Sequence, residues 1–179
     1  MPSCSRCNNK FSSLDEKFRV FLSAEENRSA AGQHILSTKV LSAESVKGRP
    51  FREIGISLRP VWVESGPLTV QKWKLSMPKK EAEAFLFRLT QGLIFKYYPQ
   101  LHSLKAYFHL EYLSDPNEVN PFIALLNSRI PVMKLMRIGI DVFDYRHGAE
   151  NEGSLWEFVF YGSVRFVVVH SFRHHPLFD

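Results

Sequence analysis

The hydrophobic periodicity of this chain changes along its length, and that change limits the folds it can form. Apolar residues at 11–22 and again at 82–93 recur every three or four positions, the period of an amphipathic helix. From Phe51 onward other stretches alternate apolar and polar residues, which is typical of strands with one buried face. The sequence therefore predicts an α+β fold: a small Cys-containing N-terminal hairpin and helix, then a mostly antiparallel sheet packed by one long helix near 79–97.

Local signals place the two predicted helices. Ser12 and Ser13 each precede an acidic residue by three positions, a capping-box pattern that predicts a helix from Ser12 to a point between Asn27 and Gly32. We expect its apolar stripe to be core. The long helix is predicted to begin at Pro78 and to end before Pro99, because proline disfavours helical geometry in the residue before it.

The strand pattern predicts segments at 54–58, 68–75, 104–112, 136–142, 155–161 and 164–170. Pro60 is expected to break or end the first strand, and 64–67 is expected to form a turn. Gly162 and Ser163 favour a type II′ hairpin. Asn120 and Pro121 predict the start of a short helix, and the acidic stretch around Asp141 and Asp144 is interpreted as a solvated loop.

Charge gives a weak indication of partner. The formal net charge is +5, which favours polyanions such as DNA, although a plain basic surface is an equal alternative. Lys72, Lys74, Lys79 and Lys80 lie close in sequence and could contact phosphate or simply face solvent. The chain has no long apolar stretch and no signal-like N-terminus, so we expect a cytoplasmic protein with no membrane partner.

Both cysteines, Cys4 and Cys7, fall in one C-x-x-C pair. This spacing suits binding of one Zn²⁺, but a structural site takes four ligands and the motif supplies two. A redox pair is the second interpretation; it needs a preceding strand, for which Met1–Ser3 are too few residues. Two unconnected thiols are the third.

The segment from Pro2 to Phe18, with Cys4-Ser-Arg-Cys7-Asn8 at its centre, resembles the second half of the HNH endonuclease motif, the ββα-metal or treble-clef module. The resemblance implies a structural zinc at Cys4 and Cys7, and it places Asn8 at a family position near the catalytic metal. The stretches 88–95 and 155–166 are also similar to the C-terminal region of uncharacterised bacterial HNH-type proteins.

The chain departs from that family in its catalytic half. HNH endonucleases carry earlier zinc ligands and an upstream histidine that activates water, whereas all seven histidines here follow the motif, beginning at His34. We therefore expect weak zinc binding and no DNA cleavage by this chain. A catalytic divalent metal is expected only with a complete nuclease module.

The resulting prediction has three parts: 1–30 is a partial HNH-like zinc knuckle and helix, 31–50 is a linker, and 51–179 is an α+β domain of unknown function. The expected function is that of an HNH-endonuclease-like, nucleic-acid-associated protein without nuclease activity of its own. The alternative is a non-catalytic binding or regulatory domain that carries a vestigial zinc knuckle.

Overall fold

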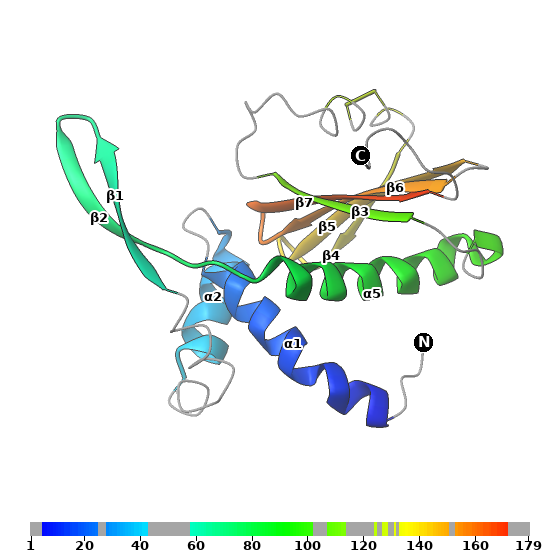
Figure 1. The fold of residues 1–179 in the computed structure, drawn as a ribbon, viewed down its shortest axis with the longest axis horizontal. Helices are drawn as coiled ribbons and strands as arrows, with labels where there is room; N and C mark the ends of the chain where they lie inside the picture. The colour runs from blue at the N-terminus through cyan, green and yellow to red at the C-terminus, as the bar shows by residue number, and fades with distance from the viewer. Residues whose placement is uncertain are drawn as a thin grey trace.

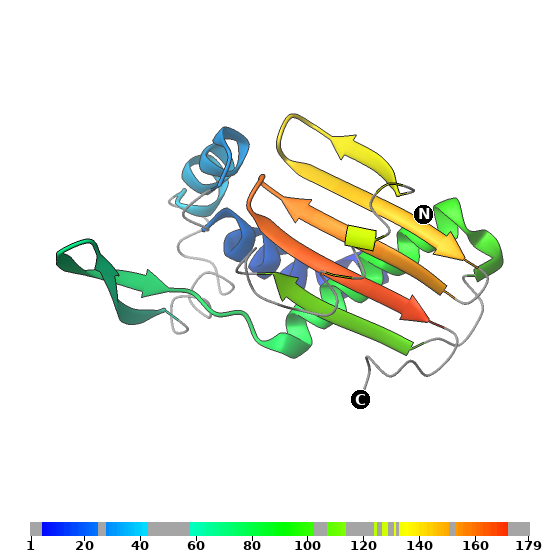
Figure 2. The ribbon, with the colours of Figure 1, turned by 90° about the horizontal axis from the view of Figure 1, so that it is seen from above.

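The structure is a computed structural model that describes residues 5–24, 28–42, 58–101, 107–113, 124, 127–128, 131, 133–150 and 153–171. It confirms the α+β class: a five-stranded antiparallel sheet of order β3-β7-β6-β5-β4 carries helices on one face, and a separate β1-β2 hairpin projects away from it (Figures 1 and 2). The helical elements are α1 (Ser5–Ser23), α2 (Ala30–Ile35), the π-helix η1 (Leu36–Val40), α5 (Lys79–Tyr97) and the 3₁₀ turn η2 (Pro99–Leu101). The strands are β1 (Arg59–Ser65), β2 (Leu68–Lys74), β3 (Tyr107–Leu113), β4 (Lys134–Ile138), β5 (Phe143–Glu150), β6 (Gly153–Phe160) and β7 (Val164–Ser171).

The face of the large sheet that the helices cover is mostly aromatic. Alternate residues of the central strands point to this face, and cross-strand partners such as Tyr145 with Phe158, and Phe158 with Phe166, lie directly opposite one another. These rings form one buried cluster with apolar residues of the two long helices. The core members from the sheet are Tyr145, Trp156, Phe158, Phe160, Val164, Phe166 and Val168.

Helix α5 lies against this aromatic face and confirms the predicted long helix. Leu86 and Ile94, two helical turns apart, are both fully buried on the side that meets the sheet. The helix begins directly after Pro78, and the break before Pro99 follows as predicted. Its bounds were therefore readable from periodicity and from two prolines.

Helix α1 is longer toward the N-terminus than predicted. It begins at Ser5 rather than Ser12, and it ends at Ser23, before the predicted limit of Asn27. No glycine or proline interrupts this segment, so nothing local stops the helix at the two serines. The prediction of an N-terminal hairpin around the cysteines is wrong for the described residues, because the backbone from Ser5 onward is helical.

Phe18 joins α1 to the rest of the core. Its ring is fully buried, stacks on Phe85 of α5 with centroids 3.8 Å apart, and meets Phe160 of β6 edge-on at 5.8 Å. With Leu22 it belongs to the same cluster as the sheet residues, so the predicted core role of the α1 stripe is confirmed for these residues. The predicted division into 1–30, 31–50 and 51–179 stays a prediction, but the first and last parts share one core.

Ion pairs flank this apolar contact. Arg88 of α5 bonds to Asp15 of α1, and its guanidinium lies 4.4 Å from the centre of the Phe11 ring. Lys17 Nζ lies 3.0 Å from Glu81 Oε1, again between α1 and α5. Two ion pairs therefore lie at the border of the contact between α1 and α5.

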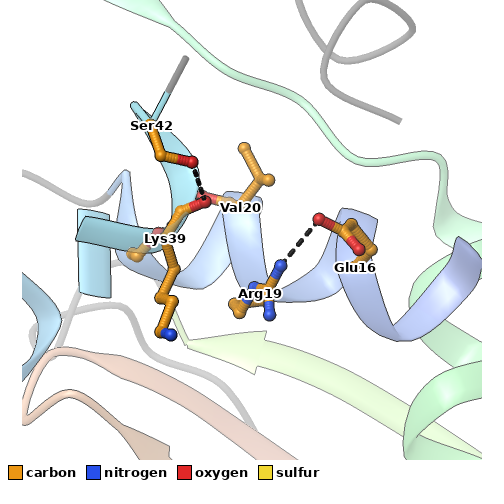
Figure 3. A network of polar contacts seen from close by, with 6 residues as sticks. Glu16, Arg19, Val20, Lys39 and Ser42 are labelled. Carbon is orange, nitrogen blue, oxygen red and sulfur yellow. Dashed lines mark hydrogen bonds and ion pairs between the residues drawn. The ribbon is translucent and has the colours of Figure 1, made fainter. Parts of the chain in front are cut away.

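Helix α1 also lies against η1 (Figure 3). Val20 and Val40 are both buried there. Within α1, Arg19 Nη2 lies 2.6 Å from Glu16 Oε1, and at the end of η1 the Ser42 hydroxyl donates to the Lys39 carbonyl at 3.4 Å. The segment predicted as a linker with a short helix thus holds α2 and η1, which rest on the first helix.

Ser29 ties α2 to two turns of the sheet. Its side chain caps Gly32 N–H at 3.3 Å and donates to the Asp141 carbonyl at 2.7 Å, while its own N–H donates to the Tyr161 carbonyl at 2.7 Å. A Cβ on Gly32 would lie 2.9 Å from Tyr161 Cβ, so this glycine permits the close approach. Ser29, at the end of the predicted N-terminal part, is therefore an N-cap and a tertiary contact.

The β6–β7 turn differs from the predicted type II′ turn. Tyr161 and Gly162 both have positive φ, +49° and +72°, and Ser163 N–H donates to the Phe160 carbonyl. This is the pattern of a type I′ turn one residue earlier than predicted. The strained Tyr161 backbone is held by the bond from Ser29 and by its own N–H, which donates to the Val142 carbonyl at 3.0 Å.

Three further predictions need correction. Pro60 lies inside β1, where it pairs with Trp73, because a two-stranded ribbon is all edge and tolerates a missing N–H. The strand predicted to run through 142 ends at Ile138, since Gly139 and Asp141 take positive φ. The acidic loop predicted around Asp144 is largely strand β5. The predicted strand at 54–57 and, apart from Ala124, the predicted helix from Asn120 lie outside the described residues.

Replacing Phe18 with alanine tests the shared core. We expect Phe18→Ala to lower the free energy of unfolding by about 3–5 kcal/mol, because it leaves a cavity between α1, α5 and the sheet. Urea denaturation followed by circular dichroism should show one earlier transition for the whole chain. Leu41→Ala, at an exposed position, is the control and should change little. An unchanged midpoint in Phe18→Ala would show that α1 is not part of the core.

Candidate nucleic-acid interface and a buried histidine cluster

The site predicted from sequence is only partly described. Cys7 and Asn8 lie in the first turns of α1, whereas Cys4 precedes the described residues. Within the described part of the chain, the structure holds no group of three or more His, Cys, Asp or Glu side chains placed to bind a metal ion. The predicted ligand pair Cys4 and Cys7 and the predicted role of Asn8 therefore stay predictions.

The β1–β2 hairpin is a second candidate, and its register sorts its side chains onto two faces. Residues paired across the strands point to the same side of the ribbon. One face carries Trp62 opposite Gln71, and Trp73 opposite Pro60. Both tryptophans are solvent-exposed, with 70% and 65% of their surface accessible. Tryptophan is usually highly buried in a folded protein, so two exposed rings on one face indicate a binding surface.

The opposite face of the hairpin is basic near the body of the protein and apolar near the tip. Arg59 lies directly across from Lys74, and Lys72 lies across from Val61. Glu64 is the only acidic residue between 59 and 74, so this ribbon carries a net charge of +2. The sequence had singled out Lys72 and Lys74 as candidate phosphate contacts, and the hairpin places both on one face.

Local sequence explains why this segment forms a hairpin. Val, Trp and Thr favour extended backbone on both strands. Gly66 takes a φ of +61° at the first central position of the two-residue turn, where type II′ hairpins place glycine, and Pro67 follows. The turn predicted at 64–67 is therefore confirmed.

A third feature is a buried aromatic and histidine cluster under the C-terminal end of α5. His147 of β5 is 3% exposed, and its Nδ1 lies 2.8 Å from the Tyr98 hydroxyl. The imidazole stacks between Tyr97, at 4.5 Å, and Trp156, at 5.0 Å. Its Nε2 has no hydrogen-bond partner among the described residues. Burial, with a smaller contribution from the Lys134 charge, lowers the pKa of His147 and keeps it neutral.

The same cluster holds a tyrosine pair. The hydroxyls of Tyr97 and Tyr145 lie 2.8 Å apart. The hydrogen bond with Tyr145 lowers the pKa of Tyr97, whereas burial raises the pKa of Tyr145. Either hydroxyl can donate the hydrogen bond between them. The cluster thereby fastens the end of α5 to β5 by two side-chain hydrogen bonds.

The sheet face away from the helices carries ion pairs. Glu157 of β6 is buried between Arg146 of β5, at 3.6 Å, and Arg165 of β7, at 3.3 Å. Arg137 of β4 lies 3.7 Å from Asp144. Asp144, which the sequence placed in a solvated loop, therefore has a cationic partner on the neighbouring strand.

Sequence reasoning missed two of these features. It placed Trp73 in a strand and Trp62 outside the predicted strands, and alternation alone does not say whether either face of a strand is covered. It placed His147 in a loop, because the charges of Asp144 and Arg146 hid the alternation of β5. The signal that was present is the period-two series Phe143, Tyr145, His147.

Comparison with known proteins adds no relative: no protein-family model, no curated protein and no solved structure matches this chain. The resemblance to the HNH motif thus rests on the residues quoted above. Among the described residues, no helix has the length and apolar character needed to cross a membrane.

The buried histidines predict a pH dependence of stability. Burial lowers the pKa of both His147 and His170, so the unfolded chain takes up protons below about pH 6.5 while the folded chain resists them. The free energy of unfolding should therefore fall as the pH drops from 7 toward 5, by up to ~1.4 kcal/mol per pH unit for each histidine. Urea titrations at several pH values measure this.

A substitution tests whether His147 contributes to this pH dependence of stability. His147→Phe keeps the stacking between Tyr97 and Trp156 and removes one titrating group, so its stability should depend less steeply on pH. His34→Gln, at an exposed position of α2, serves as the control and should keep the wild-type slope. Equal slopes for wild type and His147→Phe would contradict the assignment.

Proposed function

We propose that this chain is a nucleic-acid-binding protein whose contact surface is the β1–β2 hairpin. The observation that carries the proposal is the combination of two exposed tryptophans with three basic residues, Arg59, Lys72 and Lys74, on one projecting ribbon. Nucleic acids offer flat bases to aromatic rings and phosphates to cations, so one ligand satisfies both faces. The net charge of +5 adds a general attraction for polyanions.

The resemblance of the Cys4–Asn8 segment to HNH endonucleases supports the same class of partner. We propose a cytoplasmic protein related to that family, with DNA as the first ligand to test. We expect no cleavage, because no histidine of this chain matches the family position that activates water. The alternative, a non-catalytic regulatory domain that binds a protein through the same ribbon, predicts no effect of the basic residues on oligonucleotide binding.

Zinc stays part of the proposal for the N-terminal segment. Cys4 and Cys7 supply two thiolates of the four ligands that a structural site takes, and the described residues offer no ready cluster to complete it. The residues therefore fit half a site, and we derive no chemical step through a metal.

Metal analysis tests the zinc proposal. Protein purified without added metal should hold less than one equivalent of zinc and should lose it readily to a chelator, because the motif supplies only two of the four ligands. The Cys4→Ser/Cys7→Ser variant should hold none. A full equivalent that survives both the chelator and the double substitution would show that these thiols are not the ligands.

Charge removal tests the nucleic-acid proposal. The variant Arg59→Gln/Lys72→Gln/Lys74→Gln should bind a labelled oligonucleotide about tenfold more weakly at 0.1 M salt. Its plot of log K against log salt should be less steep, because fewer phosphates are neutralised. Fluorescence anisotropy over a range of salt concentrations measures both quantities.

The matched control is Lys39→Gln/Lys96→Gln/Lys134→Gln, which removes the same charge from exposed positions of η1, α5 and β4. It should bind nearly as well as wild type. Equal losses in the two variants would mean that net charge alone attracts the ligand, and no binding by wild type would end the proposal.

A further inference from the structure

The two hairpin tryptophans form a diagonal pair on one face. Trp62 lies opposite Gln71, and Trp73 is two residues further along the same strand as Gln71, opposite Pro60. Diagonal neighbours of an antiparallel pair are about 7–8 Å apart, within reach of large aromatic side chains. The rings are therefore adjacent and accessible on a single surface.

This spacing is informative about the ligand. Successive bases of a B-form strand rise by roughly 3.4 Å, so bases placed on the two rings would be separated by about twice that rise. A strand that binds both tryptophans has to be unstacked and extended, with ring faces uncovered. Bases within a duplex have both faces covered by their neighbours, so the duplex offers these rings no planar partner.

The tryptophan face also lacks the side chains that most often read a duplex. Two-stranded ribbons can enter the major groove, where the commonest specific contact is made by arginine or lysine to guanine. The tryptophan face carries neither; besides the two tryptophans its members are Pro60, Glu64, Thr69 and Gln71. This face is therefore better suited to stacking on bases of any type than to reading the sequence of a duplex.

Phosphate contacts come from the other face. Lys72 and Lys74 flank Trp73 in β2. Because β2 is an edge strand of a two-stranded ribbon, the long aliphatic parts of these side chains can bring their ammonium groups around the edge toward the tryptophan face. Arg59 and Lys74 are like charges directly opposite each other, an arrangement that destabilises a strand pair. A phosphate near this pair removes the repulsion.

From these observations we infer that the hairpin binds single-stranded nucleic acid in preference to duplex, with bases stacked on Trp62 and Trp73 and the backbone along Arg59, Lys72 and Lys74. The inference rests on the proposed function, since it specifies the form of nucleic acid that the same surface takes. Little sequence preference is expected, because every base has a flat face.

Intrinsic fluorescence gives a direct test. The chain has three tryptophans, of which Trp62 and Trp73 are exposed and Trp156 is fully buried in the core. Stacking should quench the two hairpin residues and leave the third unchanged. The probes are a 12-residue oligothymidine and a 12-base-pair duplex of mixed sequence, titrated into the full chain at the same salt concentration.

Three variants sharpen the test. Wild type should bind the oligothymidine at least about tenfold more tightly than the duplex, and Trp62→Ala and Trp73→Ala should each lose about tenfold or more of that affinity. Trp62→Phe/Trp73→Phe keeps flat rings and strand-forming side chains, so it should retain most binding, measured by anisotropy. That variant also separates loss of stacking from collapse of the hairpin.

The outcomes distinguish this inference from the proposed function. Equal or tighter binding of the duplex, or alanine variants that bind oligothymidine like wild type, would overturn the single-strand inference while leaving charge-driven binding intact. Binding of neither probe would overturn both. A dimer in sedimentation equilibrium that dissociates in Trp62→Ala/Trp73→Ala would instead assign the ribbon to a second copy of this chain.

Discussion

Phe18 determines how the helical layer lies on the sheet. Its ring stacks on Phe85 of α5 and also meets Phe160 and Phe166 from two neighbouring strands. One side chain of α1 therefore contacts both the other long helix and the sheet. An interior packed to crystal-like density leaves few alternative positions for such a ring. The ion pairs Arg88–Asp15 and Lys17–Glu81 then lie at the border of a contact that the aromatic rings already specify.

The other end of α5 is fixed by a different interaction. There Tyr97 and Tyr98 hydrogen-bond to Tyr145 and His147 inside an otherwise aromatic layer. Buried polar groups are costly unless they are paired, and pairing them selects one arrangement of helix on sheet. The first half of α5 thus depends on apolar stacking and the last turn on hydrogen bonds, which together prevent the helix from sliding along the sheet.

The sequence predicted the elements whose signals are local. Helix α5 has a clean apolar period between Pro78 and Pro99, and β6 and β7 alternate around a glycine turn. Sequence-based prediction failed for strand β5, whose pattern of charges makes sense only together with the neighbouring strand. The charge of Arg146 in β5 is paired with Glu157, which lies opposite it on β6, and that pairing is not visible in either segment alone.

The candidate site was less predictable than the fold for a related reason. The C-x-x-C motif is recognisable at once, yet it gives two ligands and the helix that carries Cys7 adds no third among the described residues. The hairpin has no motif at all. The hairpin is a candidate site because Trp62 and Trp73 are exposed. That exposure follows from the way the ribbon projects from the rest of the protein, which no residue of the ribbon reveals by itself.

A projecting two-stranded ribbon is marginally stable by itself in water, and this one carries the extra repulsion between Arg59 and Lys74. Ordering such a segment costs conformational entropy that its few internal contacts scarcely offset. A ligand that binds the ordered form shifts that balance in its favour. To do so here it has to cover apolar rings on one side and neutralise cations on the other. A single nucleic-acid strand carries both properties on one backbone, whereas a protein partner needs an apolar pocket and a separate acidic patch at the matching distance.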